Sequence, residues 1–148
     1  MYRKILVPLD GSVTSQQGLK QAIRLARESG ARLRLVHVVD ETPTIGMIEG
    51  GVDITPVVRE LMRSGRELLA RGQRLAEKAG VQAETAIHES LGGAAADTIL
   101  TEAKKWHADV IVMGTHGRRG LRHVVLGSQA ERVVHRSAVP VLLVRASG

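Results

Sequence analysis

One glycine-rich stretch holds the residue types best suited to binding a phosphorylated ligand. It reads Gly114-Thr115-His116-Gly117-Arg118-Arg119-Gly120, and Gly127-Ser128 follows seven residues later. The preceding run, residues 109–113, is apolar and predicts a buried strand, while the following segment has helical periodicity. Glycines let a ligand approach the backbone closely, and the free N–H groups at a helix N-terminus attract anions. The stretch therefore predicts a nucleotide-binding loop between a strand and a helix.

Side chains within this loop could strengthen phosphate binding. Arg118 and Arg119 could meet phosphate charge, and of the six histidines only His116 lies in the predicted site. Ser128 with Glu131 three residues later forms a capping-box pattern, which predicts Ser128 as the helix N-cap. Each feature also has a plain structural interpretation, as a turn, a solvated arginine pair or an ordinary capped helix. The histidines show no metal-ligand spacing, so no protein-bound metal is predicted.

A carboxylate ends the first predicted strand. In open α/β sheets ligands bind beyond the carboxyl ends of the strands, at a topological switch point. If the first and fourth strands are neighbours, Asp10 lies beside Gly114, with Pro8, Leu9 and Met113 at the same strand ends. The Asp10 carboxylate could accept ribose hydroxyls or help to hold a phosphate-bound Mg²⁺ or Mn²⁺. Locally, a turn-forming role for Asp10 before Gly11 is equally favoured.

Several known nucleotide and catalytic motifs are absent. No G-x-x-x-x-G-K-[ST] occurs, and the glycines are spaced G-x-x-G-x-x-G rather than G-x-G-x-x-G. There is no G-x-S-x-G motif, and nothing in the sequence pairs Ser128 with a base. The pattern therefore predicts nucleotide binding without naming a catalytic residue.

Composition narrows the class of protein. The 148 residues suit one domain spanning residues 1–148, with 43% hydrophobic and 24% charged residues. There is no cysteine, no apolar run long enough to span a membrane and no room for a signal peptide before the first strand. We therefore expect a cytoplasmic protein without a membrane partner. The net charge of +6 invites a nucleic-acid hypothesis, but Trp106 and Tyr2 are the only aromatic residues, so no nucleic-acid partner is expected.

Strands and helices are predicted to alternate along the chain. A capping-box pattern at Thr14 and Gln17 predicts the start of the first helix, and Gly30 its end. Gly65 and Gly72 inside the second helix indicate either close packing against another backbone or a locally weak helix. The alternation predicts a parallel sheet with helices on both faces. The expected strands are 3–9, 33–39, 81–88, 109–113 and 140–144, the helices are 14–30, 55–79, 94–106 and 128–136, and residues 40–54 form a long loop.

Strand composition predicts the edges of the sheet. The third strand alternates in polarity, which suits an exposed edge. The fifth strand must then form the other edge, although Val141, Leu142, Leu143 and Val144 are all apolar. Since an apolar edge strand needs cover, a homodimer joined through this strand is expected.

The chain resembles the universal stress protein family, and specifically its ATP-binding subgroup. The family signature is Gly, two residues, Gly, nine residues, then Gly followed by Ser or Thr, and Gly114, Gly117 and Gly127-Ser128 match it. The resemblance covers essentially the whole chain, through residues 5–12, 35–40, 108–117 and 137–144. It implies a Rossmann-like fold of the adenine nucleotide alpha hydrolase type, with a three-layer, open, twisted five-stranded parallel sheet of order 3-2-1-4-5. It also implies a homodimer through the fifth strand.

The resemblance further implies an ATP site, with ADP or AMP as alternatives. Val38 corresponds to an adenine-contacting position, while Asp10 and Gly114 lie near the ribose. The phosphates, often with a divalent metal, would be held by Gly117, Gly127, Ser128 and the backbone of Gln129. One departure is Leu91-Gly92-Gly93-Ala94-Ala95, which lacks the proline common in the family and so predicts a looser turn there.

Three functions are consistent with these observations. The first is a nucleotide-dependent stress-response protein, in a dimer that contacts unidentified proteins. The second is a slow metal-dependent ATPase or nucleotidyl-transfer enzyme using Asp10 with His116 or Arg118. The third is a scaffold that binds no nucleotide. The sequence leaves open whether ATP is hydrolysed, which partner is contacted and which stress is involved.

Overall fold

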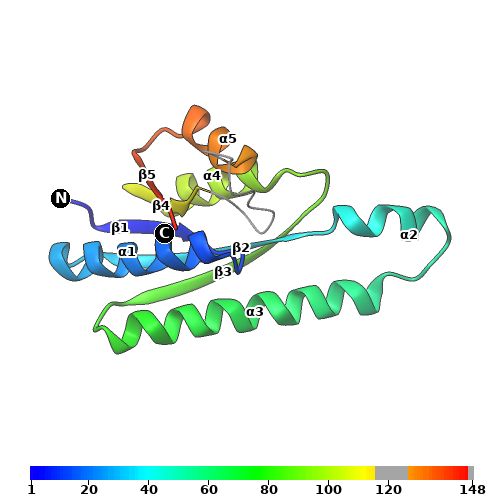
Figure 1. Cartoon of the computed structure of the whole chain (residues 1–148), viewed down its shortest axis with the longest axis horizontal. Coiled ribbons are helices and arrows are strands. Elements are labelled where there is room, and N and C mark those ends of the chain that lie inside the picture. Colours follow the sequence, from blue (N-terminus) through cyan, green and yellow to red (C-terminus); the bar gives the residue numbers. More distant parts are fainter. Residues whose placement is uncertain (116–126, 147–148) are drawn as a thin grey trace.

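A five-stranded parallel sheet of order β3-β2-β1-β4-β5 forms the centre of the protein. The computed structural model describes residues 1–115 and 127–146. This strand order confirms the prediction, with β3 and β5 at the two edges (Figure 1). The strands are β1 (Lys4–Pro8), β2 (Arg32–Asp40), β3 (Ala83–Ser90), β4 (Val110–Gly114) and β5 (Val141–Val144). The longer helices are α1 (Val13–Ser29), α3 (Thr55–Lys78), α4 (Ala95–Trp106) and α5 (Ser128–Arg136), and η1 (Thr42–Thr44) with α2 (Ile45–Glu49) precede α3.

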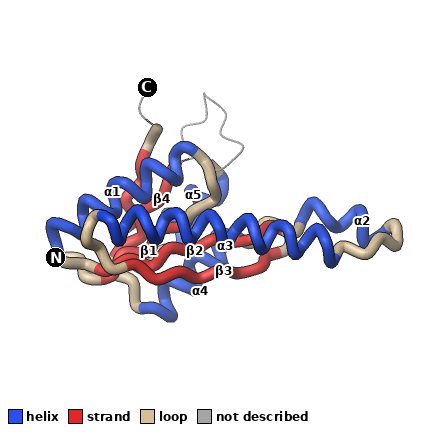
Figure 2. Tube along the Cα trace, turned by 90° about the horizontal axis from the view of Figure 1, so that it is seen from below, coloured by secondary structure: helices blue, strands red, loops and turns tan. Residues whose placement is uncertain are grey.

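Helices cover both faces of the sheet. The helices α1 and α3 pack on one face of the strands, and α4 and α5 pack on the other. Figure 2, which is seen from below, shows α3 in front of the strands. The alternation of side chains along β1 explains this arrangement. Ile5 and Val7 join the core under α1 and α3, whereas Leu6 joins the core under α4 and α5. All three side chains are fully buried, so β1 is the central strand against which both layers pack.

The start of α1 differs from the prediction. Its N-cap is Ser12, whose hydroxyl accepts the Ser15 N–H at 3.1 Å, so the predicted capping box at Thr14 and Gln17 is wrong. Thr14 and Ser15 are instead buried, in the first turn of the helix. The predicted end of the helix is confirmed, because Gly30 is the C-cap with φ of 72°.

The two glycines of α3 make room for neighbouring side chains. A Cβ at Gly65 would lie 2.5 Å from Cδ2 of His37, and one at Gly72 would lie 3.0 Å from Cδ1 of Leu35. Both glycines are therefore closely packed, but against side chains, so the prediction of close packing against another backbone is wrong about the partner. The helix comes close to β2 because it lacks a Cβ at these two places.

Residues 40–54 are more ordered than the predicted loop. They contain η1 and α2, and the chain then turns back into α3 at Thr55, with Pro56 in the first helical turn. Figure 1 shows α2 and the start of α3 extending beyond the ends of β2 and β3. In the part of the chain that the structure describes, no helix is long and apolar enough to cross a membrane.

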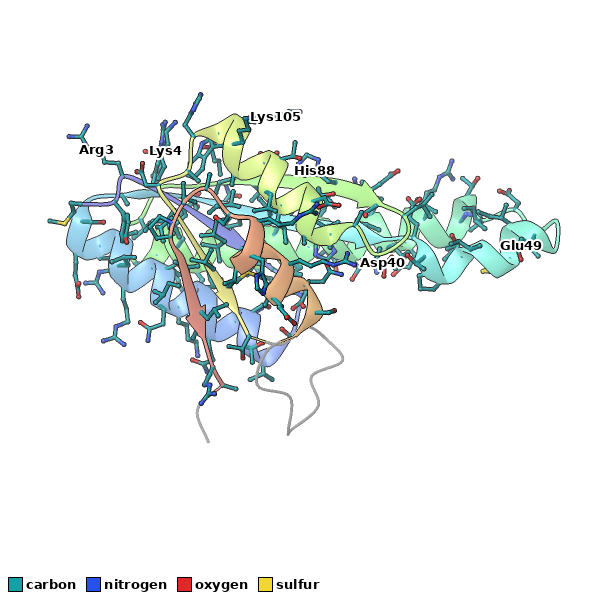
Figure 3. The ribbon with its side chains drawn as sticks, turned by 90° about the horizontal axis from the view of Figure 1, so that it is seen from above. Arg3, Lys4, Asp40, Glu49, His88 and Lys105 are labelled. Atoms are coloured by element: carbon teal, nitrogen blue, oxygen red, sulfur yellow. The ribbon has the colours of Figure 1, made fainter. Side chains whose placement is uncertain are left out.

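An ion-pair network joins β2, β3 and α4. Arg34 donates to Glu102 at 2.6 Å and lies 3.2 Å from Glu84, while His88 donates to the second carboxylate oxygen of Glu102 at 2.9 Å. Figure 3 shows His88 between β3 and α4. Burial alone would raise the pKa of Glu102, but the hydrogen bonds from Arg34 and His88 outweigh it and hold that pKa below its ordinary value. Glu102 is thus ionised and anchors α4 to β2 and β3.

This network predicts an acid-sensitive part of the stability. Because the pKa of Glu102 is lower in the folded state, its stabilisation is present above the unfolded-state pKa and is lost as pH falls through the folded-state value. We expect Glu102→Gln to lower the free energy of unfolding at pH 7 by about 1–3 kcal/mol and to flatten its decline as pH falls below the ordinary glutamate pKa of 4.5. Urea unfolding at several pH values measures both effects.

The exposed carboxylate Glu60, which pairs with Arg63 on α3, provides a control. Glu60→Gln should change the free energy of unfolding by less than about 1 kcal/mol, because exposed pairs contribute little. Parallel pH curves for Glu102→Gln and the wild type would contradict the role given to Glu102.

Candidate nucleotide site

The candidate site lies at the carboxyl ends of β1 and β4. These strands are paired, with Ile5 opposite Val110 and Leu6 opposite Ile111. Pro8, Leu9 and Asp10 therefore leave the sheet at the same edge as Met113 and Gly114. The order of the sheet reverses here, since β1 continues to β2 on one side and to β4 on the other. The predicted meeting of the two strand ends at the switch point is confirmed.

Gly114 is required by the packing of α1 against β4. A Cβ at this position would lie 2.6 Å from both the backbone carbon and Oγ1 of Thr14, and 2.8 Å from the Ser15 nitrogen. Backbone atoms cannot give way as a flexible side chain would. The glycine thus has a structural role apart from any ligand, which the sequence pattern did not indicate.

The two halves of the glycine signature are joined through the backbone. The N–H of Gly127 donates to the carbonyl of Thr115 at 2.6 Å, and the N–H of Thr115 donates to the carbonyl of Val144 at 3.0 Å. Thr115 is buried. The chain therefore returns to the end of β4 when it enters α5. His116, Gly117, Arg118 and Arg119, which belong to the predicted site, lie outside the described residues.

Within residues 1–115 and 127–146, the N-terminus of α5 has no side-chain cap. Gly127 is the N-cap, with φ of −69° and ψ of 154°. The prediction of Ser128 as N-cap is therefore wrong, because the helix begins one residue earlier and Ser128 is its first residue. The first N–H groups of a helix have no intrahelical acceptor. These groups suit an anion such as a phosphate.

Gln129 ties α5 to the turn between β3 and α4. Its amide oxygen accepts from the Ala96 N–H at 2.9 Å, and its amide nitrogen donates to the Gly93 carbonyl at 3.0 Å. The turn also contains Gly92, whose N–H donates to the hydroxyl of Thr42 at 3.0 Å. These bonds hold the turn that was expected to be loose without a proline. Because the Gln129 side chain is bonded to the turn, the predicted phosphate contact of Gln129 involves its backbone.

Asp10 takes part in the turn that follows β1. Its carboxylate accepts from the Ser12 N–H at 2.9 Å, and Gly11 between them has φ of 85°. The turn-forming role is therefore confirmed. Asp10 is only partly buried and lies beside the end of β4. The contact between Asp10 and a ribose stays a prediction. In residues 1–115 and 127–146, no group of three or more histidine, aspartate or glutamate side chains could hold a metal ion.

His37 is a residue of the site region that sequence reasoning missed. Its Nδ1 lies 2.7 Å from the carbonyl oxygen of Leu9, so Nδ1–H is the donor. The ring is buried, and it packs against Gly65. It therefore fixes the backbone just before Asp10. A histidine inside the apolar run of β2 is the signal that could have found it.

The next residue, Val38, which is the predicted adenine contact, is partly buried on the opposite face of the sheet, against the core under α4.

These features define a class of α/β protein in which a helix N-terminus lies at the switch point of a parallel sheet. The chain belongs to the universal stress protein family, whose sequence model matches residues 1–145. Universal stress protein MJ0531 of Methanocaldococcus jannaschii is 40% identical over 147 residues, which cover 98% of this chain and 83% of that protein. The solved structure of MJ0577 has a TM-score of 0.85 and 28% identity, covering 100% of this chain and 99% of that one.

Two solved structures of the same fold contain nucleotides. A universal stress protein in complex with cAMP has a TM-score of 0.65 and covers 99% of this chain and 98% of its own. A universal stress protein of Archaeoglobus fulgidus in complex with dAMP has a TM-score of 0.70 and covers 97% of this chain and 98% of its own. Each is 24% identical to this chain, so the likeness is one of fold.

The packing at Gly114 predicts a large effect from one methyl group. We expect Gly114→Ala to lower the free energy of unfolding by about 1–3 kcal/mol, because the added Cβ forces α1 away from β4. Gly46→Ala is the matched control, since nothing lies within 4 Å of a Cβ there. Urea unfolding of both variants measures the difference, and equal stability of the two would contradict the packing role of Gly114.

Proposed function

We propose that this protein is an ATP-binding, homodimeric regulatory protein of the cytoplasm, in which the bound nucleotide acts as a ligand and signal. The observation that carries the proposal is the N-terminus of α5, which no side chain of the described residues caps and which the Gly127–Thr115 bond joins to the switch point of the sheet. Such a terminus attracts phosphate through its N–H groups and the helix dipole. The nucleotide complexes of related folds support an adenine nucleotide as the ligand.

The proposed pose places each part of ATP against a different element. The adenine lies near Val38 of β2, and the ribose lies near Asp10 and Gly114. Pro8, Leu9 and Met113 line the strand ends beside it. The phosphates bind backbone groups of Gly117, Gly127, Ser128 and Gln129, with Arg118, Arg119 and His116 contributing side chains. Mg²⁺ or Mn²⁺ would bind with the phosphates, near Asp10. ADP and AMP are the alternative ligands, and no catalytic residue is assigned.

Nucleotide binding is tested by closing the entrance to α5. Gly127 has φ of −69°, which valine can also adopt, so Gly127→Val adds bulk at the helix entrance without backbone strain. We expect it to weaken ATP binding by at least about tenfold, or about 1.4 kcal/mol, in isothermal titration calorimetry. Gly46→Val, at a position with nothing within 4 Å of a Cβ, is the control and should bind as the wild type does.

Mass spectrometry of small molecules released from the purified wild-type protein identifies the ligand as ATP, ADP or AMP. Undiminished ATP affinity in Gly127→Val would refute the site. No released nucleotide, together with no thermal shift on adding Mg-ATP, would support the scaffold function instead.

The homodimer is proposed through β5. This strand is an edge of the sheet, and Leu142 is 45% exposed although it is a leucine in a strand. Val141, Leu143 and Val144 are only partly buried. An exposed apolar edge is stabilised when another strand or subunit covers it. The second copy would supply that cover.

A charge at Leu142 tests this interface. We expect Leu142→Arg to halve the mass measured by light scattering at micromolar concentration, because a buried unpaired guanidinium opposes association. Leu75→Arg, at a leucine of α3 that is 41% exposed, is the matched control and should leave the mass unchanged. A wild-type protein with the same mass as Leu142→Arg would argue against the interface.

A further inference from the structure

The side chain of Gln129 joins the first turn of α5 to the first turn of α4. These helices lie on the same face of the sheet (Figure 1). The N-cap residue of α4 is Ala94, whose methyl side chain cannot accept a hydrogen bond. The Gln129 amide oxygen accepts from the Ala96 N–H at 2.9 Å instead. Because Ala96 is the second residue of α4, its N–H is one of those that a cap residue ordinarily satisfies. A side chain of α5 therefore caps α4.

The same amide supports the turn that precedes α4. Gly92 and Gly93 have φ of 72° and 73°. Glycine loses more backbone freedom on folding than any other residue, so two in succession make this turn costly to order. The Gly93 carbonyl accepts from the Gln129 amide at 3.0 Å and from Arg132 at 3.4 Å, and the Gly92 N–H donates to Thr42. The turn is therefore held largely by side chains of α5.

Of the two helices, α4 is the more firmly attached to the sheet. It buries large apolar side chains such as Trp106, and its Glu102 carboxylate is bonded to β2 and β3. In contrast, α5 has nine residues, of which Ala130 and Val133 are buried. We infer that α4 supplies the fixed position and that Gln129 transfers it to the entrance of α5.

The predicted phosphate contacts of α5 lie between two points of attachment. The Gly127 N–H is bonded to Thr115 at the end of β4, and the Gln129 side chain is bonded to α4, with Ser128 between them. The first bond within the helix runs from the Glu131 N–H to the Gly127 carbonyl. The N–H groups of Ser128 and Gln129 thus have no acceptor within the helix. Both attachments hold these groups in place before a ligand arrives, and such preorganisation strengthens binding.

We propose that the Gln129 side chain is a positioning residue that sets the affinity of the nucleotide site for phosphate groups. This inference rests on the proposed function, because it requires that the N-terminus of α5 binds phosphate. Both ends of the amide are bonded to protein groups, so it acts on the ligand through the backbone of α5. The proposed nucleoside contacts, Val38 and Asp10, belong to other elements. Loss of the amide therefore weakens the binding of phosphates and spares the binding of the nucleoside.

Binding of ATP and of adenosine by one variant tests this role. Gln129→Met keeps the length and the helix propensity of the side chain but removes both of its hydrogen bonds. We expect its Kd for ATP to rise at least about fivefold, because the N–H groups of the first turn lose their fixed positions. The Kd for adenosine, which has no phosphate, should change by less than about twofold. Competition against radiolabelled ATP measures both constants.

Gln73→Met is the matched control. The Gln73 amide of α3 also donates to a backbone carbonyl, that of Ala83, at 2.8 Å. The helix α3 packs on the face of the sheet opposite α5, so both constants should stay within about twofold of the wild type.

The outcomes separate positioning from general loosening of the fold. Equal weakening of ATP and adenosine binding in Gln129→Met would mean a merely structural role and would overturn the proposal, as would an unchanged Kd for ATP. A wild-type protein that binds no ATP would instead refute the proposed function, and this inference with it.

Hydrogen exchange provides a second measurement, which does not depend on adenosine. Coupling between two sites is reciprocal, so phosphate bound at α5 must strengthen the capping of α4 by Gln129. We expect saturating Mg-ATP to slow amide exchange in residues 94–98 of the wild type at least about threefold. In Gln129→Met, whose circular dichroism should match the wild type, ATP should leave exchange in these residues unchanged. Equal slowing in the two proteins would count against the proposal.

Discussion

The close contact between the first turn of α1 and the end of β4 is the constraint on which the site depends. It exists because Gly114 has no side chain, so that Thr14 and Ser15 reach the β4 backbone. The contact fixes the position of the backbone at the end of β4, and this in turn fixes the position of Thr115, the next residue. Thr115 accepts the Gly127 N–H and so fixes where α5 begins. One missing methyl group thus determines the position of the helix N-terminus that defines the candidate site.

The same principle applies where α3 packs on the same face of the sheet as α1. Gly65 lets α3 approach β2 until it touches His37, and the buried His37 ring donates to the Leu9 carbonyl. The end of β1 is therefore held by α3 through an imidazole, beside the place where the first turn of α1 contacts β4. A ligand site at a switch point needs such support because the strand ends themselves are loops.

The architecture could largely be predicted from the sequence. The hydrophobic pattern of each strand indicates whether one or both of its faces are buried, and this indicates whether the strand lies at an edge or inside the sheet. Residues 141–144 and the alternating third strand were enough to place both edges of the sheet. Helix starts were less predictable. Ser12 rather than Thr14 caps α1, and Gly127 rather than Ser128 precedes α5, because several adjacent residues can serve as caps and only tertiary contacts choose between them. The packing of Gly114 and the bond from His37 join residues far apart in the sequence, so no local pattern contained them.

The side-chain amide of Gln129 limits how α5 can move. It bonds in both directions to the β3–α4 turn, as an acceptor for Ala96 and a donor to Gly93. A helix that slides by one residue moves about 1.5 Å along its axis, which would break both bonds together. The amide therefore acts as a pin that removes axial sliding from α5. Arg132 and Arg136 add contacts from further along α5 to Gly93 and Asp97, so we expect α5 to move together with the β3–α4 turn and α4.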